Sequence, residues 1–307
     1  MRSGWRWLIL GAVVAVLAVV LAVGGPRRAV DLALANLERI ERMGRLEILA
    51  TTGWEEVPTS FETRLAWDGT DAFLVPAIAW RELAPGFVLG ELDLRRAPNP
   101  QVVSVVVTRI DPARWALRVL AGEGFPPMGI GDLARAGGAP FAVNGPFFSD
   151  RGPLGLVVVD GQQRHAPTSV WTSHFLVDGP GKPIRIAFDD PTASVDQAFQ
   201  GFPAIMKAGE AYRYMRWGGR GFDVWSVDRR TAACVDRDGW VDFVVTRTLT
   251  NGLAFHELTT LLGGLGCVDA MGFDGGTSTG LFLDVGGVRD EIANLKPVPV
   301  ALGAYPL

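Results

Sequence analysis

Short apolar segments separated by glycine-rich turns dominate the second half of the chain and restrict its fold more than any other feature. The 307 residues include 38 glycines and 20 prolines, residues that interrupt long helices and favour turns. Four such segments follow Gly129, at 139–162, 197–214, 229–246 and 267–287. Short apolar runs bounded by glycine are typical of strands joined by hairpin turns.

One segment among them has helical periodicity. In FHELTTLLGGLG, at 255–266, four leucines recur at helical spacing and glycines end the pattern. Many strands and hairpin turns with few helices predict an α+β fold. We expect a mixed, largely antiparallel β-sheet with a few packed helices in a single main domain.

The N-terminus is predicted to be a targeting segment. Arg2 and Arg6 precede 17 uncharged residues, 7–23, a length between the apolar core of a signal peptide and a membrane-spanning helix. Small residues at 22–24 suit signal peptidase, whereas arginines on both flanks leave the orientation of an anchor open. We predict that residues 1–25 form a signal peptide or an N-terminal membrane anchor, and that the protein is exported to the periplasm or the extracellular space.

Residues 26–79 are predicted to precede the main domain as an accessory region. The pattern at 30–43 indicates an amphipathic helix, and alternating residues around Asp68-Gly69 indicate a hairpin. The main domain is then predicted to cover 80–307.

Charge excludes one class of partner. Lys and Arg total 29 against 33 Asp and Glu, a formal net charge of -4, so no broad basic surface is available to neutralise a phosphate backbone. We expect no nucleic-acid partner. If the N-terminal segment is not cleaved, the membrane is an expected partner.

The two cysteines, Cys234 and Cys267, lie inside apolar, strand-like segments. Two are too few for a disulfide scaffold, although they are enough for one bridge. Because cysteine packs as a small apolar residue, we expect two buried thiols.

A serine-hydrolase motif occurs once, without its usual context. Residues 276–280 match G-x-S-x-G, which would make Ser278 a nucleophile. The following residues, LFLDV, alternate like a strand, whereas the motif needs a helix there. All three histidines precede Ser278, although in that fold the histidine follows the serine. A serine hydrolase is therefore the least favoured hypothesis.

Cofactor motifs are absent from the sequence. There is no CxxC, no HExxH and no G-x-x-x-x-G-K-[ST] loop. The D-R-D-G segment at 236–239 departs from the spacing of a calcium loop and predicts a hairpin turn between two strands. We expect no cofactor, and leave open only a divalent cation held by residues far apart in sequence.

Polar residues stand among glycines at the ends of several apolar segments. Asn144-Gly145 follows one segment, Arg230-Thr231 begins another, and residues 274–278 follow a third. Glycine lets a backbone approach a ligand closely. Carboxylate, guanidinium, amide and hydroxyl groups are the groups that bind a sugar phosphate. Each group alone would also suit a turn, but together they form a candidate sugar-phosphate site.

In this order, the same segments resemble the phosphodiester glycosidase family. The family carries N-G-G-F-F, P-L-G-L and D-G segments, then R-T-A-x-G-x-D-x-D-G, then G-x-V-D-A-x-x-x-D-G-G-G-S. Their counterparts here are, in order, 144–148, 153–156, 160–161, 230–239 and 266–278. The resemblance covers roughly 80–305.

The resemblance implies a hydrolase that cleaves between the anomeric carbon of a sugar and the oxygen of a phosphodiester. Its substrate would belong to an envelope or extracellular glycan. The departing phosphomonoester has a second pKa of about 6, so it needs less help from a general acid than an alcohol does.

Two residues are the candidate catalytic groups. Arg230 would hold the departing phosphate, because its planar fork matches phosphate oxygens. Asp274 would act as base for water or would stabilise an oxocarbenium-like centre, and the sequence does not choose between these roles. The candidate substrate-binding residues are Asn144, Gly145, Thr231, Gly275, Gly276, Thr277 and Ser278. No metal ligand is predicted.

Two departures from the family motifs support an alternative function. Pro146 replaces a glycine and lacks a backbone N–H that could face a ligand. Thr277 adds bulk where the family has glycine. The alternative is a glycan or sugar-phosphate binding protein in envelope assembly that lacks turnover. Asp274, Arg230 and Asn144 favour the enzyme, because binding alone would not require all three groups.

Overall fold

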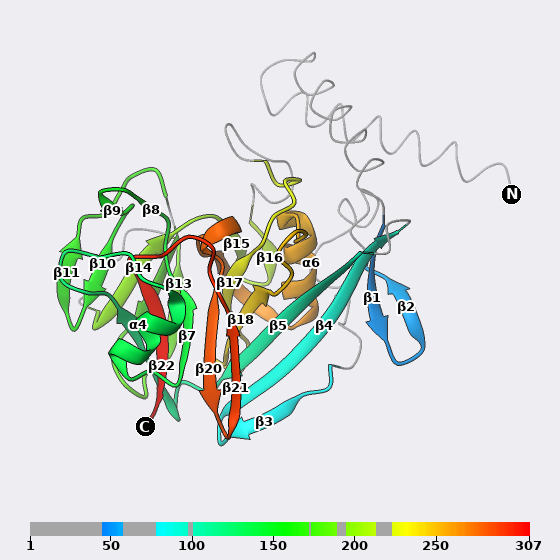
Figure 1. The fold of residues 1–307 in the computed structure, drawn as a ribbon, viewed down its shortest axis with the longest axis horizontal. Coiled ribbons are helices and arrows are strands. Elements are labelled where there is room, and N and C mark those ends of the chain that lie inside the picture. The colour runs from blue at the N-terminus through cyan, green and yellow to red at the C-terminus, as the bar shows by residue number, and fades with distance from the viewer. Residues whose placement is uncertain (1–44, 58–77, 98–100, 172, 189–194, 213–222) are drawn as a thin grey trace, which may run out of the picture.

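The computed structural model describes residues 45–57, 78–97, 101–171, 173–188, 195–212 and 223–307 (Figure 1). The predicted signal or anchor at 1–25, the helix at 30–43 and the Asp68-Gly69 hairpin lie outside these residues. Within them, no helix combines the length and apolar character needed to cross a membrane.

The largest sheet has ten strands in the order β16-β15-β19-β17-β18-β5-β4-β1-β2, with β3 paired to β4. Its strands are β1 (Arg45–Ala50), β2 (Gly53–Glu56), β3 (Arg81–Ala84), β4 (Phe87–Ala97), β5 (Val102–Ile110), β15 (Ala204–Lys207), β16 (Glu210–Ala211), β17 (Thr231–Asp236), β18 (Val241–Thr246) and β19 (Cys267–Gly272). Because β1 pairs with β4, the chain from Arg45 onward joins the main sheet.

Two five-stranded sheets and one small ribbon complete the strand structure. One sheet has the order β11-β10-β14-β12-β13 and the other β21-β20-β7-β22-β6, while β8 pairs with β9. The first comprises β10 (Val157–Val159), β11 (Gln162–His165), β12 (Ser173–Val177), β13 (Ile184–Ala187) and β14 (Gln197–Gly201). The second comprises β6 (Trp115–Leu120), β7 (Phe141–Asn144), β20 (Leu281–Val285), β21 (Val288–Ile292) and β22 (Ala301–Pro306). The ribbon is β8 (Phe148–Ser149) and β9 (Gly152–Pro153).

The sheets are antiparallel and the fold is richer in β-structure than predicted. The predicted largely antiparallel sheet and single main domain are confirmed, but every strand pair among the described residues is antiparallel, so the expected mixture with parallel strands is wrong. Short turns can join antiparallel strands, whereas parallel strands need long crossovers, usually helical. The hairpin predicted at 236–239 joins β17 and β18, with Gly239 at a φ of +83°. A single domain of antiparallel sheets with little helix replaces the α+β prediction.

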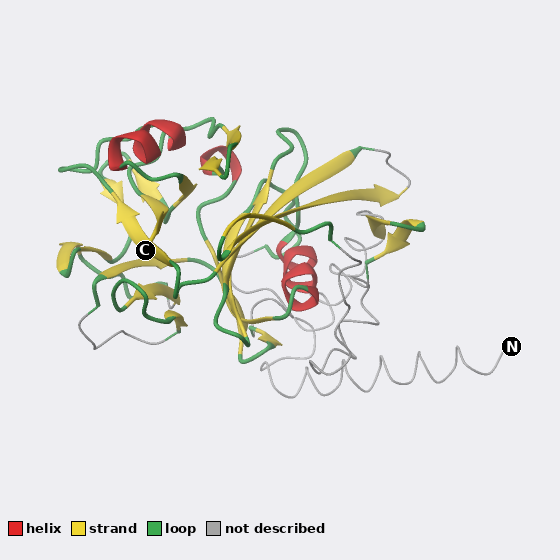
Figure 2. Ribbon diagram, turned by 90° about the horizontal axis from the view of Figure 1, so that it is seen from below, coloured by secondary structure: helices red, strands yellow, loops and turns green. Residues whose placement is uncertain are grey.

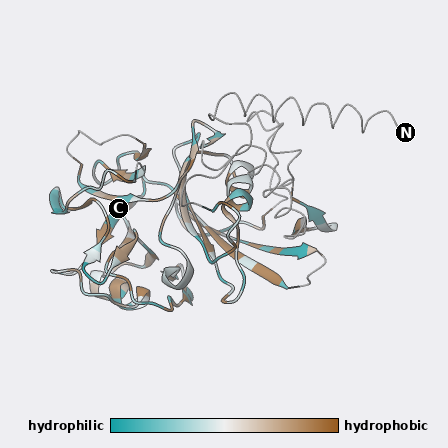
Figure 3. Cartoon of the chain, turned by 90° about the horizontal axis from the view of Figure 1, so that it is seen from above, coloured by the Kyte–Doolittle hydropathy of each residue, from teal (hydrophilic) through white to brown (hydrophobic). Residues whose placement is uncertain are grey.

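Alternating side chains bury both faces of the ten-stranded sheet. In β5, Val106 packs into a core that includes Phe141 and Phe243, whereas Val105 and Val107 face the opposite side. That opposite side is covered by the predicted helix, α6 (Phe255–Gly264) (Figure 2). Figure 3 shows hydrophobic colouring along many of the strands, interrupted by hydrophilic stretches.

A second helix, α4 (Ile130–Gly137), was not predicted. It packs Ile130, Leu133 and Ala134 against the sheet that contains β7 and β22, and it ends at Gly138 with a φ of +63°. Its eight residues are too few to give a helical period that stands out among the surrounding glycines. The glycine that ends the helix is the local signal that could have located it.

Cys234 and Cys267 form a disulfide, which corrects the expectation of two thiols. Both residues are buried as predicted, but β17 and β19 are neighbours in the sheet and bring the two Cα atoms within 5.7 Å. This spacing is usual for a disulfide. The sequence could not indicate the pairing because the two strands are separated by β18 and α6 along the chain.

Removing this disulfide should lower the free energy of unfolding by about 2–4 kcal/mol, because the bond closes a loop of 33 residues in the unfolded chain. Urea unfolding of the double variant Cys234→Ala/Cys267→Ala against the native sequence measures the loss. A reductant should lower the unfolding midpoint of the native protein and leave that of the variant unchanged. Equal midpoints of the native protein with and without reductant would contradict the prediction.

Candidate active site

Asn144, at the end of β7, joins three segments that are distant in sequence. Its side chain is fully buried. The amide oxygen accepts hydrogen bonds from the Thr231 hydroxyl at 2.6 Å and from the Gly280 N–H at 3.0 Å, and the amide nitrogen donates to the Asp274 carbonyl at 2.7 Å. Asn144 therefore holds β17, β20 and the loop after β19 together. Direct contact of Asn144 or Thr231 with substrate stays a prediction.

Phe273 anchors the loop that carries Asp274. Its ring centroid lies 4.7 Å from that of Phe199 and 5.9 Å from that of Phe175, within the main core. The next residue is fixed through its backbone, because the Asp274 N–H donates to the Gly145 carbonyl at 3.0 Å. Gly145 is thus a backbone partner of the loop, and the Asp274 carboxylate is attached to a rigid part of the molecule.

The Asp274 carboxylate has a pKa raised to about 6, chiefly because burial penalises its charged form. Hydrogen bonds from the Ser278 hydroxyl and the Gly275 N–H, together with the charge of Lys296, oppose this rise, while Asp228 adds to it. A carboxylate that titrates near neutral pH can accept a proton from water more readily than an exposed one.

Glycine is required at two positions of the Asp274 loop. A Cβ at Gly275 would lie 2.8 Å from the carbonyl oxygen of Arg229, closer than real Cβ contacts. Gly276 has a φ of +60°, and a Cβ there would lie 3.1 Å from Asp228 Oδ2. The predicted close approach at these glycines is therefore an approach to the neighbouring chain segment 228–229; an approach to a ligand stays a prediction.

Ser278 lies in the short 3-10 helix η1 (Gly276–Ser278) and is buried. Its hydroxyl hydrogen-bonds the Asp274 carboxylate. Strand β20 follows it where a nucleophile elbow would have a helix, as the sequence pattern indicated. These features oppose the serine-hydrolase hypothesis and assign Ser278 to the Asp274 loop.

The two departures from the family motifs lie in different environments. Pro146 is buried next to Gly145, whereas Thr277 is exposed at the surface. The Thr277 carbonyl accepts hydrogen bonds from the N–H groups of Leu295 and Lys296 at 2.7 and 2.9 Å. The extra bulk of threonine is therefore accommodated outside the core.

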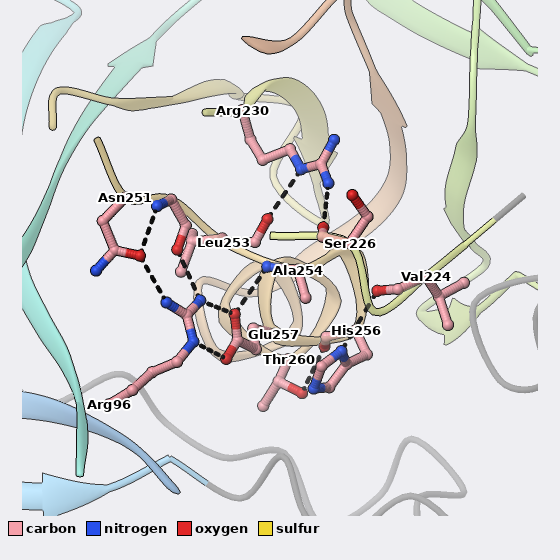
Figure 4. A network of polar contacts seen from close by, with 11 residues as sticks. Arg96, Val224, Ser226, Arg230, Asn251, Leu253, Ala254, His256, Glu257 and Thr260 are labelled. Carbon is pink, nitrogen blue, oxygen red and sulfur yellow. Dashed lines mark hydrogen bonds and ion pairs between the residues drawn. The ribbon is translucent and has the colours of Figure 1, made fainter. Parts of the chain in front are cut away.

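Arg230 directs its guanidinium at the protein backbone. Nε donates to the Leu253 carbonyl at 2.9 Å and Nη2 donates to the Ser226 carbonyl at 2.5 Å (Figure 4). The group also lies over the Phe255 ring, 3.8 Å from its centroid. These contacts occupy part of the fork that was predicted to hold phosphate. The role of Arg230 as a phosphate clamp stays a prediction.

Burial shifts the pKa of the Arg230 guanidinium downward, to about 10, against the opposing charges of Asp228 and Glu257. The group therefore remains protonated at neutral pH. Its Nη1 lies 3.7 Å from the position of a Cβ built on Gly275, so this nitrogen is adjacent to the Asp274 loop.

A buried ion pair supports the segment that holds Arg230, and sequence reasoning missed it. Arg96 of β4 pairs with Glu257 of α6 through Nε–Oε1 at 3.0 Å and Nη2–Oε2 at 2.5 Å (Figure 4). Arg96 also donates to Asn251 and to the Gly252 carbonyl, while Glu257 accepts from the Ala254 N–H. The residues lie 161 positions apart, so no local pattern connects them.

A row of half-buried aromatic rings near the Asp274 loop was also missed. Trp171 lies 5.5 Å from Phe147 and 6.4 Å from Phe202, measured between ring centroids. Phe147 follows Gly145 by two residues, and the Phe202 carbonyl lies 3.1 Å from a Cβ built on Gly272. These rings provide apolar surface at the edge of the candidate site, of the kind that lines small-molecule pockets.

One cluster of metal-ligand residue types occurs among the described residues, formed by Cys234, Asp242 and Cys267. The two sulfurs are bonded to each other, and Asp242 is paired with Arg109 through Oδ1–Nε at 2.8 Å. This cluster is thus a structural part of the sheet. The expectation that function needs no cofactor remains a prediction.

Residues 137–305, more than half of the chain, match the protein-family model for phosphodiester glycosidases. The matched residues include Asn144, Thr231 and Asp274, which the fold brings together. The chain is a member of the phosphodiester glycosidase family. No protein matched it in a search of curated proteins.

Solved structures share the fold at low sequence identity. The catalytic domain of zebrafish N-acetylglucosamine-1-phosphodiester alpha-N-acetylglucosaminidase, auto-inhibited by its pro-peptide, is 16% identical with a TM-score of 0.59, over 74% of this chain and 86% of that one. A hypothetical protein from Synechocystis is 15% identical with a TM-score of 0.56, over 76% of this chain. The match spans 64% of the Synechocystis chain.

Proposed function

We propose that this protein is an exported hydrolase that cleaves a sugar-1-phosphodiester of an envelope or extracellular glycan at the bond between the anomeric carbon and oxygen. Membership of the phosphodiester glycosidase family supports the reaction class. The observation that carries the proposal for this chain is Asp274. It combines a pKa of about 6 with a position fixed by Asn144, Gly145 and Phe273.

In the proposed reaction, water attacks the anomeric carbon while the bond from that carbon to the phosphodiester oxygen breaks. The electron pair of the broken bond leaves with the phosphomonoester. Asp274 takes a proton from water or stabilises positive charge at the anomeric carbon, and both roles need its ionised form. A phosphomonoester is a good leaving group, so the reaction depends little on a separate general acid.

Export has two kinds of support. The Cys234–Cys267 disulfide is of the kind that forms and persists in oxidising compartments outside the cytosol. The uncharged segment 7–23 after Arg2 and Arg6 has the composition of a targeting signal. We propose the periplasm or the extracellular space as the location.

The test is hydrolysis of a panel of sugar-1-phosphodiesters in water labelled with ¹⁸O, by the protein from Pro26 onward. Free sugar that carries ¹⁸O, with unlabelled phosphomonoester, is expected, because this label marks cleavage at the anomeric carbon. Label in the phosphomonoester would instead indicate attack at phosphorus and would overturn the proposed bond. Binding of the sugars without any product would favour the alternative of a glycan-binding protein, for which Pro146 and Thr277 are the sequence evidence.

A further inference from the structure

Arg229 is a buried cation with no partner among the described residues. Its side chain is 3% exposed. Its Nε, Nη1 and Nη2 atoms are all shielded from solvent, and none of them donates a hydrogen bond to any described group. Burial lowers the pKa of Arg229, although Asp228 acts in the opposite direction. Asp228 makes no ion pair with the guanidinium; its Oδ1 accepts from the Arg229 backbone N–H at 2.8 Å.

This arrangement is costly for a protein. Buried charges are normally paired, and buried polar atoms are hydrogen-bonded in the great majority of cases. An arginine stays protonated in proteins, so the cost cannot be removed by loss of a proton. A buried group left unsatisfied in this way calls for an explanation, and a role in binding an anion is one that suits a cation. The guanidinium offers five N–H donors, and its natural ligands are carboxylate and phosphate.

Arg229 belongs to the candidate active site by its position in the chain. It precedes Thr231 by two residues in a segment whose antiparallel pairing begins at the Asp228–Leu253 bridge. The first residue of β17, Thr231, contacts Asn144 through its hydroxyl. Arg230 stacks on Phe255 of α6, and its Nη1 also lies next to Gly275 of the Asp274 loop.

The Asp274 loop is hydrogen-bonded to the backbone of Arg229. The Gly276 N–H donates to the Arg229 carbonyl at 2.9 Å, and Gly275 packs against the same carbonyl. The flanking Asp228 and the nearby Thr277 are exposed, while Gly275 and Gly276 are half-buried. Residues next to Arg229 in the chain and in the Asp274 loop therefore reach the surface of the protein.

We propose that Arg229 is the residue that binds the phosphodiester anion of the substrate. The assignment rests on the proposed function and moves the main phosphate contact from Arg230 to its neighbour. Arg230 already uses Nε and Nη2 on two carbonyls, whereas no side-chain nitrogen of Arg229 has a hydrogen-bond partner among the described residues. A phosphodiester, with one negative charge and two unesterified oxygens, can accept two parallel hydrogen bonds from the planar fork.

Asp228 gives this site a preference between substrate and product. The diester carries one negative charge, whereas the phosphomonoester product carries close to two at neutral pH. The Asp228 and Asp274 carboxylates repel the product more strongly than the substrate. The same site therefore favours release of the phosphomonoester after cleavage.

Dimethyl phosphate is the probe for this proposal, because it has the anionic diester group and no sugar. We expect it to raise the melting temperature of the native protein above that in sodium chloride of equal ionic strength. Arg229→Met should weaken dimethyl phosphate binding at least about tenfold, and its melting temperature without ligand should equal or exceed that of the native protein. The matched control is Arg237→Met, which removes an exposed arginine from the β17–β18 turn and should leave binding unchanged.

Several results would overturn the assignment. A native protein that does not bind dimethyl phosphate has no anion site of this kind. An Arg229→Met variant that melts several degrees lower, or fails to fold, would mean that the guanidinium has a partner in the protein. Arg229→Lys separates charge from shape: it should bind dimethyl phosphate more weakly than the native protein and more tightly than Arg229→Met.

Failure of the assignment is distinguishable from failure of the proposed function. If dimethyl phosphate binding depends on Arg229 while no diester is hydrolysed, the anion site stands and the hydrolase proposal falls. If sugar-1-phosphodiesters are hydrolysed at equal kcat/KM by the native protein and Arg229→Met, the hydrolase stands and the role of Arg229 falls.

Discussion

Replacing Asp274 with asparagine should lower kcat/KM for a sugar-1-phosphodiester by at least about a hundredfold, the size expected when a general base or charge-stabilising carboxylate is lost. Asparagine keeps the shape of the side chain and can still hydrogen-bond the Ser278 hydroxyl and the Gly275 N–H, so the loop should be preserved. Direct measurement of free sugar over time provides the rates.

The control for this variant is Asp238→Asn, which removes an exposed carboxylate in the β17–β18 turn and should leave kcat/KM unchanged. If Asp274→Asn retains more than about a tenth of the native kcat/KM, Asp274 is not the carboxylate that the reaction uses. Dimethyl phosphate binding by Asp274→Asn that is at least as tight as that of the native protein would confirm that the loop is intact in the variant.

The pH profile should follow the titration of Asp274. Both proposed roles need the ionised form, and its pKa is about 6. kcat/KM should therefore be level above this pH and should fall about tenfold per unit below it. A profile that is level down to pH 4.5, or one that rises as pH falls below 6, would contradict these roles.

Stability should change in the opposite sense. The pKa of Asp274 is higher in the folded chain than its ordinary value of 3.8, so folding favours the protonated form. The resulting stabilisation is fully present below about pH 4 and is lost as pH rises through about 6. Asp274→Asn should remove this contribution to the pH dependence of unfolding, as urea titrations at pH 4, 5 and 7 would reveal.

Glu257→Ala should lower the free energy of unfolding by about 3–5 kcal/mol, because it leaves the buried Arg96 without its counter-charge. Arg96 and Glu257 are 8% and 1% exposed, and the two hydrogen bonds between them lie inside the sheet–helix core. The Ala254 N–H at the start of α6 would lose its acceptor as well. Urea unfolding gives the change.

A double-mutant cycle separates the ion pair from general packing. Arg96→Met should also be destabilising, but Arg96→Met/Glu257→Ala should lose less than the two single losses added, because no unpaired charge remains. If the losses simply add, the two side chains are not coupled and the prediction fails. Loss of the ion pair should also disturb Arg230. The Arg230 Nε–H donates to the Leu253 carbonyl, and Leu253 follows Gly252, whose carbonyl accepts a hydrogen bond from Arg96.

Features set by neighbouring residues could be predicted from the sequence. The leucine spacing at 255–266 predicted α6, and the Asp238-Gly239 pair predicted the β17–β18 turn. The alternation of LFLDV predicted β20, which removed the serine-hydrolase reading of Ser278. In each case the periodicity or turn chemistry of a few adjacent residues is sufficient, because the structure formed is local.

The sequence motifs and their order along the chain also identified residues that the fold brings together. Asn144, Thr231 and Asp274 were selected as separate polar groups among glycines, and the structure joins them through one amide. Their separations of 87 and 130 residues carry no local signal. What connected them at the sequence level was the resemblance to family segments in the same order.

The sequence by itself determined the family, the local strands and turns, and the kinds of chemical groups available to the site. Tertiary structure decided which groups are engaged and which are free. Arg229 and Arg230 are adjacent and chemically identical, yet their guanidinium groups have different surroundings. One is held by two carbonyls over an aromatic ring, and the other is buried without a described partner. Burial and partners depend on segments distant in the chain, so only the folded molecule could distinguish them.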